Sequence, residues 1–314
     1  MRFSIIIPLY NKAPYVKKAL ESVICQTFRD FEVIIVDDGS FDNSYNAAKE
    51  ALRDSIVNHK LIQQDNAGVS TARNNGVVAS KGDFLCFLDA DDWWAPTFLE
   101  RMDIFIREYP DACIYGTNYY YVKNGQQHVC VSTADTGYIN YCRVYAEKLE
   151  MPLWTGSVCL PRTVFEEMGG FKPCLRLGED FDLWIRIALK YKVAFLNEPL
   201  SYYYQDSDPK WRLVGKLQEP HCHMLWNLNY LSEEEKTNPD YKRLIDGLRT
   251  YSLMPYYLSK QYHQAAKAEL AKVDWNLQSV KTRNLYALPL LLLRVRRLVL
   301  GIGSIIKQWL IKHL

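Results

Sequence analysis

The chain has 314 residues, of which 48% are hydrophobic and 24% charged, so a disordered or fibrous protein is excluded and about two domains are expected. A net charge of +2 is too close to zero for a typical nucleic-acid-binding protein, and we expect no nucleic-acid partner. The charge is unevenly distributed, because residues 275–314 contain seven Lys or Arg and no Asp or Glu. An acidic body is therefore followed by a basic tail.

The sequence favours a cytoplasmic protein. The apolar run in residues 4–8 is shorter than the roughly seven apolar residues that a signal peptide needs. No segment reaches the ~18 uncharged apolar residues of a membrane span. The eight cysteines are scattered and form no C-x-x-C pair, which is typical of reduced thiols.

The first hundred residues alternate β-rich and helical segments, the pattern of an α/β fold with a mainly parallel sheet flanked by helices. The predicted strands are residues 3–7, 32–36, 60–63 and 84–88, and the predicted helices are residues 15–25, 43–52 and 70–79. Ligands bind beyond the carboxyl ends of the strands in such sheets. The acidic segments at residues 37–40 and 89–92 are therefore the first candidates for a site.

The rest of the chain reads as more helices around a few strands. We expect helices at residues 97–109, 180–191, 213–231, 241–258 and 262–273, and strands at residues 114–122 and 193–196. Asn124-Gly125 predicts a hairpin turn. We expect a catalytic domain at residues 1–205, a helical C-terminal extension at residues 206–280, and a basic amphipathic helix at residues 281–314.

Asp89 and Asp91 are candidate metal ligands. If the strand continues through them, their spacing points both carboxylates to one side. Two such carboxylates could hold Mg²⁺ or Mn²⁺ and leave positions for waters and a diphosphate. The alternative is an acidic start of the next helix, which is the commoner explanation for an isolated Asp-x-Asp tripeptide.

Three further residues have two interpretations each. Asp37 could accept hydrogen bonds from a nucleotide, or it could close an Asx turn. Arg73, in the helix that begins after Gly68, could bind a diphosphate or pair with a carboxylate. Asp180 could be a general base or could complement a helix dipole. The sequence lacks both G-x-G-x-x-G and the P-loop motif, which weighs against a dehydrogenase-type fold and a P-loop enzyme.

Taken together and in order, these segments resemble glycosyltransferase family 2, whose members have the GT-A fold. The resemblance spans residues 3–204 and rests on the collinear segments at residues 4–11, 36–40, 68–74, 81–92, 154–157, 168–171 and 178–186. It implies an inverting, metal-dependent enzyme of hexosyltransferase type that moves a sugar from a nucleotide-sugar donor, with a UDP-sugar expected. The implied acceptor is a hydroxyl of a glycan or a polyprenyl-linked glycan in surface polysaccharide biosynthesis.

The resemblance also implies roles for individual residues. The implied donor-binding residues are Pro8 and Tyr10 at the nucleobase, Asp37 at uracil or its equivalent, and Arg73 and Asp89. Asp91 would bind Mn²⁺ or Mg²⁺, and Asp180 would take the proton from the acceptor hydroxyl.

One departure from the family concerns the segment after the last strand, where members often have a Tyr-Arg-x-His segment that clamps the diphosphate. This chain has Tyr202-Tyr203-Tyr204-Gln205-Asp206, so either Lys210 or Arg212 substitutes or the clamp is weaker. His221 and His223 are not expected to bind a metal, because residues i and i+2 diverge on a helix. Two alternatives remain: a metal-dependent nucleotidyltransferase, and a non-catalytic module that binds sugar nucleotides or membrane surfaces.

The basic tail predicts contact with a membrane. Leu292, Val295, Val299, Ile302, Ile306 and Trp309 fall on one face of a helix, with basic residues beside and opposite them. This pattern is typical of a helix that lies on an anionic membrane surface, here the inner face of the cell membrane. The alternative is a helix that packs on the protein or forms a dimer, so the oligomeric state stays open.

Overall fold

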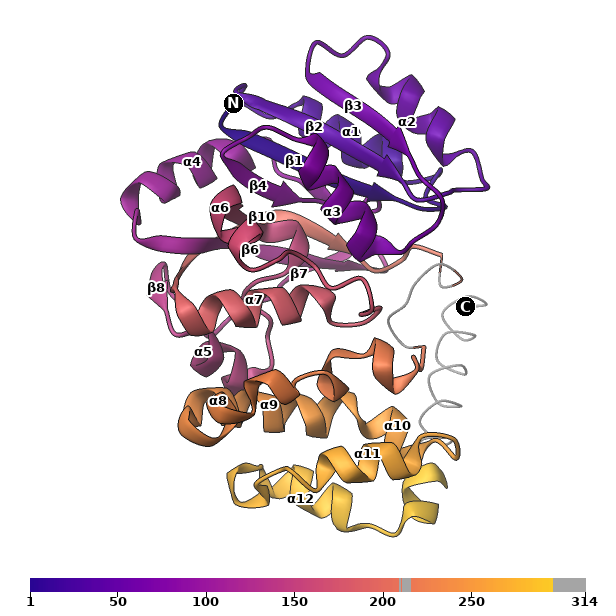
Figure 1. Ribbon diagram of the computed structural model, residues 1–314, viewed down its shortest axis with the longest axis vertical. Coiled ribbons are helices and arrows are strands. Elements are labelled where there is room, and N and C mark those ends of the chain that lie inside the picture. The colour runs from indigo at the N-terminus through magenta and orange to yellow at the C-terminus, as the bar shows by residue number, and fades with distance from the viewer. Residues whose placement is uncertain (209, 211–215, 296–314) are drawn as a thin grey trace. The chain divides into compact units, whose positions relative to one another are not determined.

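The computed structural model describes residues 1–208, 210 and 216–295, which form two compact units divided between Leu228 and Asn229 (Figure 1). The sequence places the domain boundary earlier, near residue 205. Segment 220–228 joins the first unit because the backbone N–H groups of Arg176 and Leu177 donate to the Cys222 carbonyl. The Met224 N–H in turn donates to the Leu177 carbonyl.

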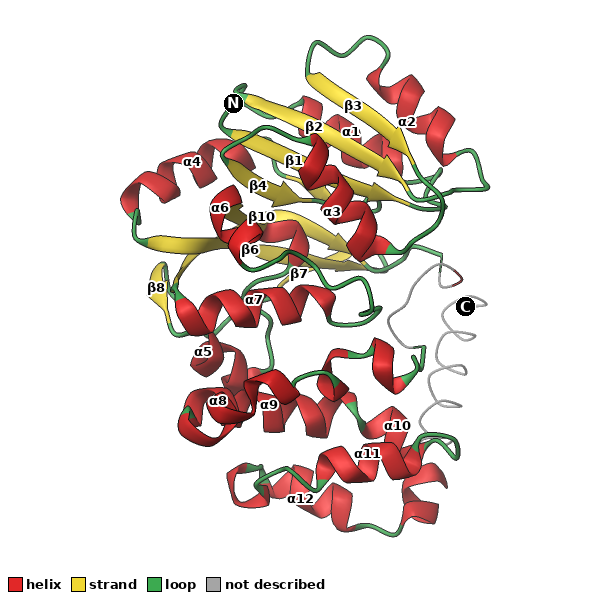
Figure 2. Ribbon diagram, in the orientation of Figure 1, coloured by secondary structure: helices red, strands yellow, loops and turns green. Residues whose placement is uncertain are grey.

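In the described residues, the first unit has a ten-stranded sheet with a central order of β3-β2-β1-β4-β9-β6-β10-β5 (Figure 2). The strands are β1 (Phe3–Leu9), β2 (Phe31–Asp37), β3 (Asn58–Gln63), β4 (Phe84–Phe87), β5 (Trp93–Trp94), β6 (Ala112–Lys123), β7 (Gln126–Val129), β8 (Gly137–Ile139), β9 (Val158–Pro161) and β10 (Lys192–Tyr204). Strands β1 to β4 are parallel, β9 is antiparallel to both neighbours, and β6 and β10 are parallel to each other. The predicted α/β fold with a mainly parallel sheet is confirmed.

Strands β1 and β2, which pair with neighbours on both sides, are buried along their whole length, as expected for a sheet covered on both faces. Their buried polar side chains satisfy one another. The Ser4 hydroxyl donates to the Glu32 carboxylate over 2.8 Å, and the Gly82 N–H donates to the Ser4 hydroxyl over 2.7 Å. This network fixes the loop before β4 against β1.

Helices cover both faces of the sheet (Figure 2). One face packs against α1 (Val16–Ile24), α2 (Ser44–Leu52) and α4 (Phe98–Glu108), and the other against α3 (Val69–Ala79), α6 (Arg162–Glu167) and α7 (Glu179–Lys190). A Cβ at Gly76 would lie 2.5 Å from the Ile6 side chain, so glycine lets α3 approach β1 closely. This approach determines where Arg73, one turn earlier, meets the sheet edge.

Two predictions about strands have different outcomes. The hairpin at Asn124-Gly125 is confirmed, with φ of 51° and 72° at these residues. Strand β10 is much longer than the predicted 193–196, because its tyrosines pair with β6 and β5 beyond an irregularity at Pro199. The stretch between β8 and β9, for which the sequence gives no clear pattern, contains α5 (Tyr141–Lys148) and a 3₁₀ turn (Thr155–Ser157).

The predicted helix at residues 213–231 is wrong for its described part, residues 216–231. This part has three short 3₁₀ turns, Pro220–Cys222, Met224–Trp226 and Asn229–Leu231, because its backbone bonds to the loop before α7. His223 is buried, accepts from the Leu225 N–H, and has a pKa that burial lowers to about 4. It is therefore a neutral packing residue.

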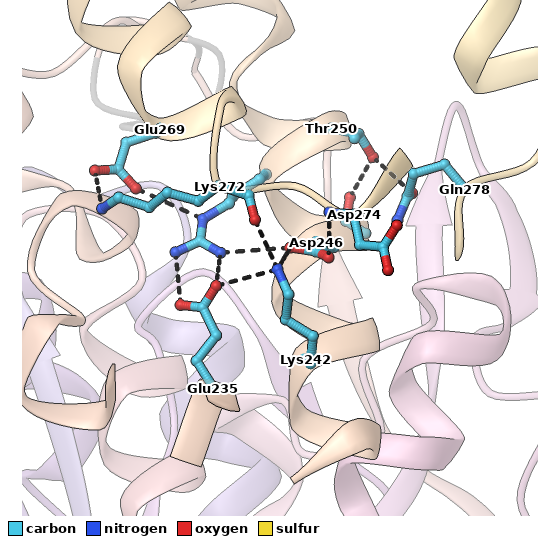
Figure 3. A network of polar contacts seen from close by, with 10 residues as sticks. Glu235, Lys242, Asp246, Thr250, Glu269, Lys272, Asp274 and Gln278 are labelled. Atoms are coloured by element: carbon cyan, nitrogen blue, oxygen red, sulfur yellow. Dashed lines mark hydrogen bonds and ion pairs between the residues drawn. The ribbon is translucent and has the colours of Figure 1, made fainter. Parts of the chain in front are cut away.

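The second unit is helical in its described part, with α8 (Ser232–Thr237), α9 (Pro239–Ser252), α10 (Met254–Leu258), α11 (His263–Leu270) and α12 (Val280–Ala287). A buried charge network joins α8, α9 and α11 (Figure 3). The Arg249 side chain, 2% exposed, pairs with Glu235 of α8, and Lys242 pairs with Glu235 and Asp246. Asp246 also accepts from the Asp274 N–H over 3.0 Å.

The predicted helix at residues 281–314 is described only to residue 295. Helix α12 ends at Ala287, and a new helical segment starts after Pro289. In that segment Leu293 is buried, whereas Leu291 and Leu292 are exposed. Residues 296–314, with Val299, Ile302, Ile306 and Trp309, lie outside the described residues. Among the described residues, no helix combines the length and apolar character needed to cross a membrane.

We predict that Arg249→Met destabilises the second unit by ~3–5 kcal/mol, because removing one partner of a buried ion pair leaves uncompensated charge. Amide hydrogen exchange of α9 and urea unfolding measure this effect. Arg243→Met, which changes an exposed arginine of the same helix, is the matched control. Equal exchange rates in α9 for both variants would contradict a stabilising role of the network.

Candidate active site

Arg73 links two acidic segments that are far apart in the sequence. One guanidinium nitrogen, Nη2, lies 2.8 Å from Asp89 Oδ1, and the other, Nη1, lies 2.8 Å from Glu179 Oε1. The Arg73 side chain is only 3% exposed. Burial alone would lower the pKa of Arg73, but the charges of Asp89 and Glu179 outweigh burial and raise it. Arg73 thus stays cationic and connects the turn after β4 to the start of α7.

Helix α7 begins with two neighbouring carboxylates in different environments. Burial, followed by the charge of Asp180, raises the pKa of Glu179 to about 7 although Arg73 opposes this shift. The Asp180 carboxylate accepts from the Thr155 hydroxyl over 2.9 Å and from the Phe181 N–H over 2.7 Å. Two hydrogen bonds therefore orient Asp180, which makes it the better placed of the two to act as a fixed base.

Asp89 and Asp91 lie in a turn, so the sequence-based expectation of a strand end is wrong. The Asp92 N–H donates to the Asp89 carbonyl over 3.0 Å and closes the turn after β4. Strand alternation therefore does not orient these carboxylates. Asp92 does not cap the next helix; it is buried and accepts from the Tyr204 N–H over 2.7 Å, which ties the turn to the end of β10.

Asp91 has a lysine partner from the loop after β1. Lys12 Nζ lies 2.5 Å from Asp91 Oδ2, and each side chain is 14% exposed. The ammonium group therefore occupies the position at Asp91 where the sequence predicts a divalent cation. Neither the position of Lys12 nor its partner can be inferred from the sequence pattern.

The loops after β1 and β2 are joined by side-chain contacts. The Asn11 side-chain carbonyl accepts from the Phe41 N–H over 3.1 Å, and the Asn11 N–H donates to the Ser40 hydroxyl over 3.0 Å. Tyr10 meets Phe41 edge to face with 6.1 Å between ring centroids. Pro8 is buried in β1 beside Val36 of β2. Pro8 and Tyr10 thus lie next to the segment that contains Asp37.

The two aspartates after β2 have different partners. Asp37 is buried and accepts from Gln63 Nε2 over 3.2 Å and from the Ser40 N–H over 3.3 Å, so the Asx-type contact is present. Asp38 accepts from the N–H groups of Ala67 and Gly68 over 2.8 and 2.9 Å. Asp38 therefore fixes the loop that starts α3.

The structure brings together part of the predicted site through direct contacts. Arg73 contacts Asp89 directly and reaches Asp180 through the adjacent Glu179. Asp91 is joined to the loop after β1 through Lys12, and Asp37, Pro8 and Tyr10 lie on the neighbouring strand ends. Sequence reasoning missed Lys12, Asp38, Glu179 and Thr155 as members of this region. Asp38, Thr155 and Glu179 carried a signal, since they stand in segments that support the family resemblance, whereas Lys12 stands outside those segments.

Comparisons with known proteins identify the family. The model of "Glycosyl transferase family 2" matches residues 4–151. A glycosyltransferase of Rickettsia conorii is 30% identical over 303 residues, which cover 89% of this chain and 49% of that protein. The chain belongs to glycosyltransferase family 2. Streptococcus pneumoniae GlyA is 38% identical over 121 residues, which cover 38% of this chain and 17% of that protein. The chain thus spans about half or less of the length of these two relatives.

Solved structures show the same fold. S. aureus TarS 1-349 in complex with UDP-GlcNAc has a TM-score of 0.71 at 20% identity, covering 88% of this chain and 83% of that chain. The mannosyltransferase PcManGT from Pyrobaculum calidifontis, in complex with GDP-Man and Mn²⁺, has a TM-score of 0.56 at 18% identity, covering 91% and 78%. The family member described here therefore has the GT-A fold.

The acidic turn fits a divalent cation that the protein holds through few ligands. Among residues 1–208, 210 and 216–295, no group of three or more His, Cys, Asp or Glu side chains is arranged to hold a metal ion. Mg²⁺ and Mn²⁺ typically use one or two carboxylates and take their other ligands from waters and phosphates. Asp91 lies in this turn, 14% exposed, and its carboxylate pairs with the Lys12 ammonium.

We predict that Glu179 makes stability depend on pH near neutrality. Its pKa in the fold, about 7, is above its usual value, so its stabilising contribution is complete below the usual value and is lost as the pH rises toward 7. From pH 5 to pH 8, the free energy of unfolding of the wild type should fall by ~2–3 kcal/mol more than that of Glu179→Gln, as measured by urea unfolding.

Glu166→Gln, at an exposed glutamate of α6, is the control and should follow the wild type at both pH values. If the free energies of unfolding of the wild type and Glu179→Gln differ by the same amount at pH 5 and pH 8, the elevated pKa of Glu179 is contradicted.

Proposed function

We propose that this chain is an inverting glycosyltransferase that moves a sugar from a nucleotide-sugar donor to a hydroxyl of a glycan or lipid-linked glycan acceptor. The observation that carries the proposal is the Arg73 bridge between Asp89 and Glu179. This bridge couples the acidic turn after β4, where a diphosphate-bound cation would bind, to the helix that presents Asp180. A leaving-group site and a base are what displacement at a sugar carbon requires.

The ends of β1 and β2 support a nucleotide-sugar donor, which we propose is a UDP-sugar. The matched structures of TarS and PcManGT contain UDP-GlcNAc and GDP-Man, respectively. In this chain Tyr10 and the exposed Phe41 would flank the nucleobase, with Pro8 beneath it and the Asp37 carboxylate accepting the imide N–H. Asp37 has a fixed orientation because the Ser40 N–H donates to one carboxylate oxygen and Gln63 donates to the other.

Asp91 would hold Mn²⁺ or Mg²⁺, and such an ion would supply positive charge to the departing diphosphate. Arg73 would not contact the diphosphate directly, because its side chain is buried and both terminal nitrogens are bonded to carboxylates. We therefore assign Arg73 to positioning Asp89 and the start of α7, while Asp89 contacts the donor.

Asp180 would accept the proton of the acceptor hydroxyl. The Thr155 hydroxyl donates to Asp180 Oδ2, which leaves the remaining lone pairs of the carboxylate for the acceptor. An oxygen that attacks the sugar carbon from the side of Asp180 while the diphosphate leaves from the side of Asp91 gives inversion at that carbon. Surface polysaccharide biosynthesis is the setting that we propose for this reaction.

We predict that Asp180→Asn lowers transfer at least ~100-fold, the usual contribution of a general base, and leaves the donor affinity within about twofold. Nucleoside diphosphate release and calorimetric titration of UDP-GlcNAc and other nucleotide sugars with Mn²⁺ measure both quantities. Asp240→Asn, in the first turn of α9, is the matched control for a helix-start aspartate. Full turnover by Asp180→Asn would refute its role as base.

We also propose that the basic tail seats the enzyme on an anionic membrane. Residues 296–314 carry four of the seven basic residues of the tail, and basic groups near anionic lipid contribute about 1 kcal/mol each. Deleting residues 296–314, which leaves the buried Leu293 in place, should abolish co-sedimentation with phosphatidylglycerol vesicles. Phosphatidylcholine vesicles are the control, and unchanged sedimentation of the truncated chain would contradict membrane seating.

A further inference from the structure

Lys12 is placed at the acidic turn by a fixed backbone and a movable side chain. Its N–H donates to the Ser44 hydroxyl over 2.7 Å, which anchors the loop after β1 to the start of α2. Its side chain passes near the Tyr15 ring, with 5.8 Å between Nζ and the ring centroid, and ends 2.5 Å from Asp91 Oδ2. The four-carbon stem of a lysine allows the ammonium to move without moving the backbone.

The charges at this edge are balanced by two internal cations. Arg73 neutralises part of the charge of Asp89 and Glu179 but is fixed by both, and its side chain is 3% exposed. Lys12 neutralises Asp91, and this pair is less buried. A divalent cation bound to Asp91 would lie within a few ångströms of the ammonium, and at partial burial the repulsion between the two cations is strong. A divalent cation would therefore compete with the Lys12 ammonium for Asp91.

Residues 205–208, beside Lys12, supply no cation for a donor diphosphate. Residues 205–208, which follow β10 and bond to the Tyr15 hydroxyl through the Asp208 N–H, contain two aspartates and no basic residue. A donor diphosphate held by the cation at Asp91 would bring negative charge to within reach of the ammonium. Ion pairing with phosphate would then replace the lost pairing with Asp91.

We propose that Lys12 is an internal counter-ion of Asp91 that a divalent cation must displace, and that the displaced ammonium binds the donor diphosphate. This inference rests on the proposed function and deepens it. Its consequence is ordered recognition: the free protein binds the divalent cation weakly, and the cation binds strongly only together with a nucleoside diphosphate. Lys12 thus disfavours the complex of the protein with a divalent cation but without donor.

Binding of Mn²⁺, measured by electron paramagnetic resonance without any nucleotide, tests the first half of this proposal. Lys12→Met should bind Mn²⁺ roughly tenfold more tightly than the wild type, because the competing ammonium is gone. Lys12→Arg should bind Mn²⁺ no more tightly than the wild type, since it keeps the charge. Lys17→Met, at an exposed lysine of α1, is the control.

Calorimetric titration of UDP in saturating Mn²⁺ tests the second half. Lys12→Met should bind UDP roughly tenfold more weakly than the wild type, and Lys12→Arg should recover most of the affinity. Circular dichroism of each variant establishes that it is folded.

Three outcomes are distinguishable. Equal Mn²⁺ affinity in the wild type and Lys12→Met would overturn the counter-ion role of Lys12. Equal UDP affinity in these two proteins would overturn its contact with the diphosphate. Mn²⁺ binding that Asp91→Asn leaves unchanged would instead overturn the metal assignment in the proposed function.

Discussion

The ion pairs of Arg73 with Asp89 and Glu179 are the interaction on which the candidate site depends. Burying the Arg73 charge costs free energy unless it is paired with good geometry, and here two contacts of 2.8 Å satisfy that condition. The fold makes this geometry possible because Gly76 lets α3 lie against β1. A residue of α3 can therefore hold the turn after β4 and the start of α7 in one place, so that donor and acceptor chemistry can share a site.

Asp91 and Lys12 also form an ion pair at the sheet edge, but this pair differs from that of Arg73 in how firmly it is held. Arg73 is fixed between two carboxylates, whereas Lys12 has one carboxylate partner and a flexible stem. The Arg73 bridge keeps Asp89 and the start of α7 in fixed positions. In the proposed mechanism, Asp91 can exchange the Lys12 ammonium for a divalent cation. The buried network around Arg249 in the second unit resembles the Arg73 case in its burial, and its role there is stability (Figure 3).

The sequence predicted the α/β architecture and the family because strand and helix periodicities are strong in the first hundred residues and the motifs are collinear. It also predicted the hairpin at Asn124-Gly125, where positive φ is needed. It failed where tertiary contacts override local pattern, as in segment 220–228, which bonds to the loop before α7. It also missed the lysine partner of Asp91 and the role of Asp38, because a charge pattern does not reveal which groups meet across a sheet edge. The roles assigned to Asp37, Asp91 and Asp180 stay predictions.

We propose that Asp91 and Asp180 serve one site, on opposite sides of the sugar carbon at which transfer occurs. Anomalous diffraction at the manganese edge, from crystals grown with UDP-GlcNAc and Mn²⁺, measures this most directly. The account predicts a manganese peak ~2.1 Å from an Asp91 carboxylate oxygen, with Lys12 moved to phosphate and the sugar carbon between the metal and Asp180. A nucleotide-bound manganese away from Asp91, or a sugar that does not face Asp180, would contradict it.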